Sequence, residues 1–309
     1  MKIVFMGTPQ FAVVSLKKLI ESRHRVLAVV TVPDKKRGRG QKMGSSAVKE
    51  FASENNIPVL QPVELKSADF IKTLQAMEPD LFVVVAFRIL PREVFAIPPK
   101  GTVNIHASLL PKYRGAAPIN WAIMNGDSET GVTTMHIDEK VDTGDILLQE
   151  KVKIDPETTA GDLHDTLAVK GSELLLKTIE KIEMGNLTPI LQNDALATKA
   201  PKINSETCRL NFSDNAQRVH DHIRGLSPYP AAFAIYNDKI MKFYQSSILD
   251  YESIAGQAGA VIAVDKDSFV IACGTGSIKI TEVQPEGRKR MSVKEFFNGY
   301  KMPIGSRFD

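Results

Sequence analysis

Two polar side chains stand two residues apart in a strand-like stretch at 102–107. Successive side chains of a strand point to opposite faces, so Asn104 and His106 would leave this strand by the same face. An amide that donates hydrogen bonds would then stand beside an imidazole that titrates near neutral pH. Further along the chain, a turn carries two carboxylates, Asp142 and Asp145, either of which could orient the histidine. These are the residue types of general acid–base chemistry.

A single histidine beside a strand is more often a structural residue than a catalyst. An isolated Asn-x-His pattern would therefore favour a structural interpretation, and the chemical one depends on the elements and motifs around it. Four other histidines have no comparable setting, and we expect structural roles for His136, His164, His220 and His222.

The first half of the chain alternates strand-like and helix-like segments. Strands are predicted at 2–6, 26–32, 81–86, 102–107, 129–136 and 144–153, and helices at 11–20, 47–52, 117–125 and 159–184. Such alternation predicts a mostly parallel sheet that is covered by helices on both faces. Ligands of such sheets bind beyond the carboxyl ends of the strands, where we expect Gly7, Phe87 and His106 to gather.

The sequence changes character after residue 190. A stretch at 193–206 has little apolar periodicity, a helix is predicted at 215–224, and about five short strand-like runs follow between turn signals. That number of short strands fits an oligonucleotide-binding (OB) barrel. We therefore predict an α/β protein with a Rossmann-like, mostly parallel sheet domain at 1–190, a linker at 191–207 and a small OB-like β-barrel domain at 208–309.

The composition excludes several classes of protein. The two cysteines, Cys208 and Cys273, are too widely spaced to indicate a disulfide framework or a metal site. A membrane-spanning helix needs roughly 20 apolar residues, and the sequence has no such run. The first residues lack the pattern of a signal peptide, so we expect a cytoplasmic protein, and we expect a monomer. The net charge of +3 requires any polyanion to bind at a local basic patch.

Several motifs together resemble a known family over the whole chain. They are Gly7-Thr8-Pro9, Asn104-Ile105-His106, Ser108-Leu109-Leu110-Pro111, Tyr113-Arg114-Gly115-Ala116-Ala117-Pro118, Asp142-Thr143-Gly144-Asp145 and the run QPEGRKRM at 284–291. The central motifs are similar to those of enzymes that use 10-formyltetrahydrofolate, and a basic loop and second domain resemble the methionyl-tRNA formyltransferase family. The resemblance implies transfer of a formyl group from 10-formyltetrahydrofolate to the α-amine of methionine on initiator methionyl-tRNA.

The resemblance also assigns roles that agree with the chemistry of the residues. His106 would carry the proton transfers and contact the oxyanion, Asn104 would donate to the developing oxygen, and Asp142 would hold the imidazole. The family pattern favours Asp142 over Asp145. The turn Ser108, Leu109, Leu110 and Pro111 would line the folate site, although it could also be only a turn that ends a strand. The reaction requires no metal.

A long basic segment at 34–44 lies between a predicted strand and a predicted helix. A run of charges is usually only solvated surface. This one follows a strand at the end of the sheet where the ligand should bind, so we expect contacts with tRNA phosphates from Lys36, Arg37, Arg39 and Lys42. The resemblance points to Arg39 as the residue that probes the acceptor end of the tRNA.

Two segments depart from the family pattern. The loop Phe87-Arg88-Ile89-Leu90-Pro91 is one residue shorter than in relatives and lacks their glycine, which affects the expected folate contacts. Lys140-Val141 replaces a glycine-containing pair before Asp142, and glycine would permit unusual backbone angles there. We therefore expect the turn at Asp142 to have a different shape.

Three alternative functions share some of these features. A formyltransferase for a small-molecule amine would have the catalytic motif but would need neither the basic loop nor the second domain. A nicotinamide-dependent oxidoreductase would fit the alternating first half, but Gly7-Thr8-Pro9 supplies one glycine where the dinucleotide motif needs several. A nucleic-acid-binding protein without catalytic activity would leave Asn104, His106 and Asp142 without a role.

Overall fold

The computed structural model describes residues 1–37, 42–249 and 258–309. The chain forms two compact units, and each unit collects segments from different parts of the sequence. The first unit contains Met1–Gly115, Thr130–Val152 and His164–Lys199. The second unit contains Ala116–Glu129, Lys153–Leu163 and Ala200–Asp309. In the part of the chain that the structure describes, no helix combines the length and the apolar character needed to cross a membrane.

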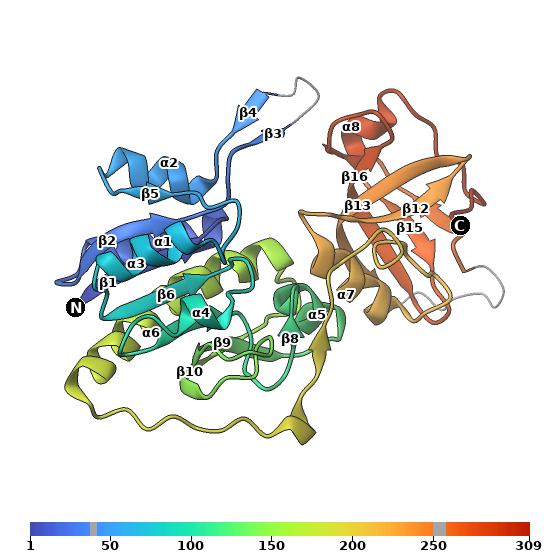
Figure 1. The fold of residues 1–309 in the computed structure, drawn as a ribbon. Coiled ribbons are helices and arrows are strands. Elements are labelled where there is room, and N and C mark those ends of the chain that lie inside the picture. The colour runs from blue at the N-terminus through green and yellow to red at the C-terminus, as the bar shows by residue number, and fades with distance from the viewer. Residues whose placement is uncertain (38–41, 250–257) are drawn as a thin grey trace. The chain divides into compact units, whose positions relative to one another are not determined.

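The first unit is built on a mostly parallel sheet of seven strands (Figure 1). In the order of the sheet, the strands are β10 (Ile146–Lys153), β9 (Glu129–His136), β7 (Thr102–His106), β6 (Leu81–Val85), β1 (Lys2–Gly7), β2 (Arg25–Val30) and β5 (Val59–Leu60). The five strands from β7 to β5 are parallel, and β9 runs antiparallel to β7. The order reverses between β1 and β6, which places a ligand crevice at the carboxyl ends of the central strands. The predicted Rossmann-like sheet is confirmed.

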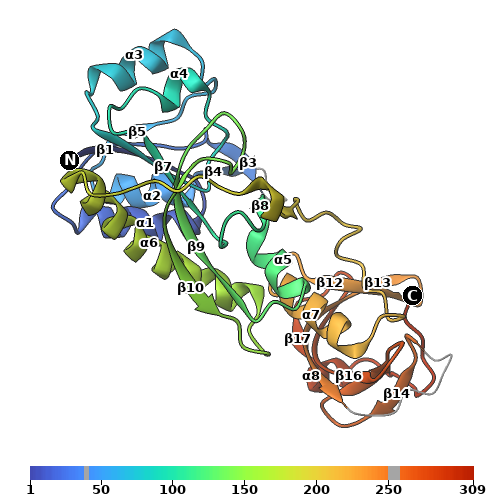
Figure 2. The ribbon, with the colours of Figure 1, turned by 90° about the horizontal axis from the view of Figure 1, so that it is seen from below.

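Helices cover both faces of this sheet, as Figure 2 shows. They are α1 (Gln10–Ile20), α2 (Ala47–Glu54), α3 (Ala68–Ala76), α4 (Arg92–Phe95) and α6 (Ala160–Met184). Val84 of β6 belongs to a core cluster with Phe70 of α3 and Val94 of α4. On the opposite face, Ile105 of β7 lies against Gly171 of α6. Because both faces are buried, the strands read as continuous apolar runs.

Local hydrogen bonds explain where several helices begin. The side chain of Ser46 accepts from the backbone N–H of Lys49 at the start of α2. The hydroxyl of Thr159 accepts from the backbone N–H of Asp162 at 3.2 Å and so caps the long helix α6. Such caps are each worth about 1 kcal/mol of stability because they satisfy backbone donors that have no partner within the helix.

Two stretches that the sequence presents as irregular contain short regular elements. The basic segment holds β3 (Lys35–Arg37) and β4 (Lys42–Gly44), which pair antiparallel. The segment after α6 holds the 3₁₀ helix η1 (Asp194–Leu196) and the strand β11 (Lys199–Ala200), which pairs with β8 (Arg114–Gly115). The segment between the two predicted domains is therefore hydrogen-bonded to the chain just after β7.

The second unit is an antiparallel sheet with three helices. The helices are α5 (Pro118–Met124), α7 (Ala216–Leu226) and α8 (Val293–Phe297). The strands are β12 (Ala232–Tyr236), β13 (Lys239–Leu249), β14 (Val261–Val264), β15 (Phe269–Ala272), β16 (Ser277–Pro285) and β17 (Met291–Ser292). They lie in the order β12-β13-β16-β15-β14, and β17 pairs with β16. The sheet encloses an aromatic cluster in which Phe308 contacts Phe212, Phe243 and Phe269. This arrangement agrees with the predicted small β-barrel.

Candidate active site

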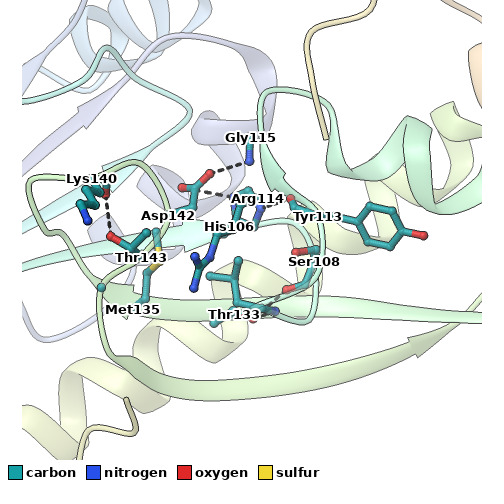
Figure 3. A network of polar contacts seen from close by, with 12 residues as sticks. His106, Ser108, Tyr113, Arg114, Gly115, Thr133, Met135, Lys140, Asp142 and Thr143 are labelled. Carbon is teal, nitrogen blue, oxygen red and sulfur yellow. Dashed lines mark hydrogen bonds and ion pairs between the residues drawn. The ribbon is translucent and has the colours of Figure 1, made fainter. Parts of the chain in front are cut away.

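His106 is the last residue of β7 and is only 6% exposed. Its Nδ1 lies 3.6 Å from a carboxylate oxygen of Asp142, and its Nε2 lies 2.9 Å from the carbonyl oxygen of Tyr113 (Figure 3). Both neighbours are oxygen acceptors, so each can receive an N–H from the ring. The imidazole is therefore held between a negative charge on one side and a backbone dipole on the other.

Asp142 occupies a tight turn between β9 and β10. Its backbone is left-handed, with φ of +57°, and its second carboxylate oxygen accepts the backbone N–H of Gly115 at 2.8 Å (Figure 3). A side chain on Gly144 would collide with the carbonyl of His136, which explains the glycine two residues further on. The unusual backbone angle thus falls on Asp142 itself and not on Lys140.

Asp145 is placed differently from Asp142. Its backbone carbonyl accepts the N–H of His136 at 3.0 Å, and the charge of its side chain acts on the imidazole of His136. Burial is the largest influence on His136 and lowers its pKa, and the hydrogen bond to Thr102 and the charge of Asp145 oppose that shift. Of the two carboxylates, Asp142 is the one beside His106.

Asn104 lies two residues before His106 in the same strand and is half-buried. Residues two apart share one face of a strand, and Asn104 pairs in register with Met135 of β9. Within residues 1–37, 42–249 and 258–309, no group forms a hydrogen bond with the Asn104 amide. A half-buried amide in this state can donate to a ligand at the carboxyl end of β7.

The turn at 108–111 is held by internal hydrogen bonds. The hydroxyl of Ser108 donates to the carbonyl of Lys112 at 2.6 Å. The Thr133 hydroxyl donates to the carbonyl of Ser108 at 2.7 Å and accepts the N–H of Leu110 at 3.1 Å, and Figure 3 shows Ser108 beside Thr133. The side chains of Ser108 and Leu110 are buried. These two residues therefore shape the turn from inside, and the carbonyls of Ser108 and Leu110 are already used by Thr133 and Gln149.

The other two residues of this turn are half-buried. Leu109 lies close to Gly131 of β9, where a larger residue would collide with the leucine side chain and with the carbonyl of Glu150. Pro111 ends the turn, and its carbonyl accepts the N–H of Thr198 at 3.4 Å. The turn is thus anchored to the sheet on one side and to the segment after α6 on the other.

Tyr113 and Gly115 take part through their backbones, which sequence reasoning did not single out. Tyr113 has φ of +60°, a left-handed conformation that is strained for a bulky residue and is often found at functional sites. The strain turns its carbonyl toward Nε2 of His106. Both residues lie in the motif at 113–118, which was the available signal, but backbone contacts have no side-chain signature.

The loop after β6 also approaches this edge of the sheet. Ala86 has φ of +47°, and the Arg88 guanidinium donates to the carbonyls of Pro62 and Val63 at 2.7 and 3.0 Å. The guanidinium also lies over the Phe87 ring, at 5.3 Å from its centre. Burial lowers the pKa of Arg88 from its ordinary value. The shortened loop is therefore tied to residues 62–63 through Arg88.

Three of the four basic residues expected to contact tRNA fall on the ribbon of β3 and β4. Lys36 and Arg37 belong to β3 and Lys42 belongs to β4. Arg39 lies outside the described residues. In the same described part of the chain, no group of three or more His, Cys, Asp or Glu side chains could hold a metal ion.

Two family models match the chain: "Formyl transferase" covers residues 1–179, and "Formyl transferase, C-terminal domain" covers residues 202–301. A methionyl-tRNA formyltransferase of Acetivibrio thermocellus is 49% identical over 306 residues, which cover 99% of this chain and 98% of that protein. The chain belongs to the methionyl-tRNA formyltransferase family. Another member, from Clostridioides difficile, is 46% identical over 99% of both chains. The resemblance noted from the sequence motifs is confirmed.

Solved structures agree with this membership of the methionyl-tRNA formyltransferase family. The crystal structure of WlaRD, a sugar 3N-formyl transferase in the presence of dTDP and 5-N-formyl-THF, has a TM-score of 0.68 and 25% identity. The match covers 94% of this chain and 99% of that one. A methionyl-tRNA formyltransferase from Clostridium thermocellum has a TM-score of 0.56 at 18% identity over 82% of this chain and 95% of that one, which supports the fold alone. The chain is a formyltransferase with both of the family's domains.

Proposed function

We propose that this protein transfers the formyl group of 10-formyltetrahydrofolate to the α-amino group of methionine on initiator methionyl-tRNA. The product would be N-formylmethionyl-tRNA for the initiation of translation, made in the cytoplasm by a monomer. The observation that carries the proposal is similarity to methionyl-tRNA formyltransferases over nearly the full length of both chains. A folate-type donor is supported by the family models and by the 5-N-formyl-THF in the WlaRD structure.

His106 is the proposed acid–base group of the reaction. With the Nδ1 proton directed at Asp142, Nε2 would hold the lone pair that takes the proton of the attacking amine. The Tyr113 carbonyl beside Nε2 would then accept the N–H of the imidazolium. Asp142 would stabilise the imidazolium that forms. His106 would then return the proton to the folate nitrogen as the bond between that nitrogen and the formyl carbon breaks. Such positioned proton transfer is typically worth ~10²–10⁴ in rate.

Asn104 is the proposed donor to the oxyanion. When the amine nitrogen bonds to the formyl carbon, the carbonyl oxygen gains a negative charge, which a preorganised N–H stabilises more strongly than it stabilises the substrate. Loss of one such donor typically costs ~10²–10³ in rate. Among the described residues, none forms a hydrogen bond with the half-buried amide of Asn104, which supports this role because the amide need not break such a bond first. The three side chains account for the reaction without a metal.

Folate would meet the turn formed by Ser108, Leu109, Leu110 and Pro111. Because the side chains of Ser108 and Leu110 are buried, folate would contact the half-buried side chains of Leu109 and Pro111. The turn follows β7 directly, so a donor bound there would lie beside His106.

The tRNA would meet Lys36, Arg37, Arg39 and Lys42. The antiparallel pairing of β3 and β4 gives residues 35–37 and 42–44 a defined backbone, and these two strands project away from the sheet of the first unit (Figure 1). Contacts of these four cations with several phosphates would produce strong dependence on salt.

A formyl-transfer assay with different acceptors tests the proposed function. The purified protein would receive 10-formyltetrahydrofolate and one of three acceptors: charged initiator methionyl-tRNA, charged elongator methionyl-tRNA or a dTDP-linked amino sugar. We expect rapid formylation of initiator methionyl-tRNA and much slower reaction with the other two. Preferred formylation of the amino sugar would replace the proposal with a small-molecule formyltransferase, and no formylation of any acceptor would reject it.

A further inference from the structure

Gln192 lies in the segment after α6 that lacks a periodic sequence pattern, yet only 7% of it is exposed. It belongs to the first unit together with His106, Tyr113, Arg114 and Asp142. A buried amide must satisfy two N–H donors and two acceptor positions, or it costs stability. All four are used here, and they reach two different segments of the active site.

The amide nitrogen of Gln192 holds the turn that carries the catalytic carboxylate. It donates to the carbonyl of Asp142 at 3.0 Å and to the carbonyl of Gly144 at 2.7 Å. These two hydrogen bonds hold the turn at both ends of the Asp142–Gly144 stretch. Because Asp142 has a left-handed backbone, it depends on such neighbours to keep its conformation.

The amide oxygen of Gln192 holds the segment on the other side of His106. It accepts from Nε and Nη2 of Arg114 at 3.1 and 2.8 Å. Arg114 directly follows Tyr113, whose carbonyl faces Nε2 of His106. The same segment after α6 also accepts the backbone N–H groups of Tyr113 and Arg114, at the hydroxyl and the carbonyl of Thr198.

The four partners determine which way the amide points. A reversed amide would set its NH₂ group against the Arg114 guanidinium and its oxygen against two carbonyl oxygens. Every contact would then pair donor with donor or acceptor with acceptor. In the observed orientation of the amide all four hydrogen bonds form, and in the reversed orientation none of them does.

We propose that Gln192 is a positioning residue for formyl transfer, which keeps Asp142 and the Tyr113–Arg114 segment at a fixed separation on the two sides of His106. The proposal rests on the proposed function. Because Gln192 is buried and its amide is fully used by protein partners, its effect would pass through the geometry of its neighbours. A misplacement of about 1 Å at a reacting group can cost ~10²-fold in rate, which sets the scale of the effect.

Two substitutions distinguish the hydrogen bonds that Gln192 donates from those that it accepts. Gln192→Met keeps the length of the side chain and removes all four hydrogen bonds. Gln192→Glu keeps an acceptor for Arg114 but removes both donors to the Asp142 turn. We expect both variants to lower kcat by roughly 10–100-fold while KM for tRNA and folate changes less than about twofold, because only the reacting geometry is disturbed. Asn193→Ala is the matched control, since Asn193 is exposed and caps only η1; its kcat should stay within about twofold of wild type.

A double-mutant cycle with Asp142→Asn shows whether Gln192 acts through the carboxylate. In the Asp142→Asn background, Gln192→Met should lower kcat by no more than about threefold, because the effects of substitutions at interacting residues are not additive. Full additivity of the two losses, or an unchanged kcat in both Gln192 variants, would overturn the proposal. If Gln192→Met does not fold, the same cycle with Gln192→Glu decides. Wild-type protein that fails to formylate methionyl-tRNA would instead reject the proposed function.

Discussion

Asp142→Asn removes the negative charge beside His106 and leaves the size of the side chain unchanged. Asparagine can still accept the Gly115 N–H, so we expect the turn to keep its shape. The carboxylate and Nδ1 are 3.6 Å apart, and the two side chains are only 12% and 7% exposed. At such a separation, two unit charges attract by about 4 kcal/mol with the effective dielectric constant that suits protein interiors.

About half of this attraction should be lost, because the asparagine dipole keeps part of it. A loss of about 2 kcal/mol in the transition state corresponds to a fall of roughly 30-fold in kcat. The charge matters most when the imidazolium forms, so KM should change little. Rapid-quench formylation at saturating tRNA and folate measures this fall directly.

Asp145→Asn is the matched control for this measurement. It removes an equal charge three residues away, from a side chain that acts on His136. We expect its kcat to stay within about threefold of wild type. A kcat for Asp142→Asn that stays within the same range, or an equal fall in both variants, would refute the assignment of Asp142 as the partner of His106.

Three further predictions concern other parts of the chain. Burial raises the pKa of Cys273 to about 12 and also raises the pKa of Cys208, so neither thiol should react with a disulfide reagent near pH 8 until the protein is denatured; fast labelling of the folded protein would contradict this. Burial lowers the pKa of His222 in the folded protein below the ordinary value of 6.5. As the pH falls, the unfolded chain therefore binds a proton at this histidine before the folded protein does, and the free energy of unfolding decreases. In urea titrations between about pH 7.5 and about pH 5, the His222→Gln variant should therefore lose less free energy of unfolding than the wild type. Equal losses in the two proteins would contradict this prediction. Arg39→Ala should raise KM for tRNA and weaken its salt dependence, and an unchanged salt slope would remove the basic segment from tRNA binding.

Much of the fold could be predicted because burial leaves a clear pattern in the sequence. The strand β6 is apolar at every position since both faces of the sheet are covered, and β9 was predicted with its observed limits. The ribbon of β3 and β4 was not predicted, because four of its six residues are charged and its pairing is made by backbone hydrogen bonds. A search for apolar periodicity cannot find such an element.

The same distinction decides which parts of the candidate active site could be predicted. The neighbourhood of His106 and Asp142 could be anticipated because their side chains carry the chemistry. The carbonyl of Tyr113 and the N–H of Gly115 could not, since every residue has these groups and only the backbone path aims them. Gln192 was missed for a related reason: a buried amide inside a polar stretch has no periodic signal, and its partners lie far away in the sequence.

The most direct test of the account is the single-turnover rate of formyl transfer to initiator methionyl-tRNA by His106→Ala, measured with tRNA and folate both saturating. If His106 moves the protons, this rate should fall by ~10²–10⁴ while the binding of tRNA and the thermal midpoint stay near those of wild type. A single-turnover rate within about threefold of wild type would show that the proton transfers occur elsewhere, and the proposed mechanism would be wrong.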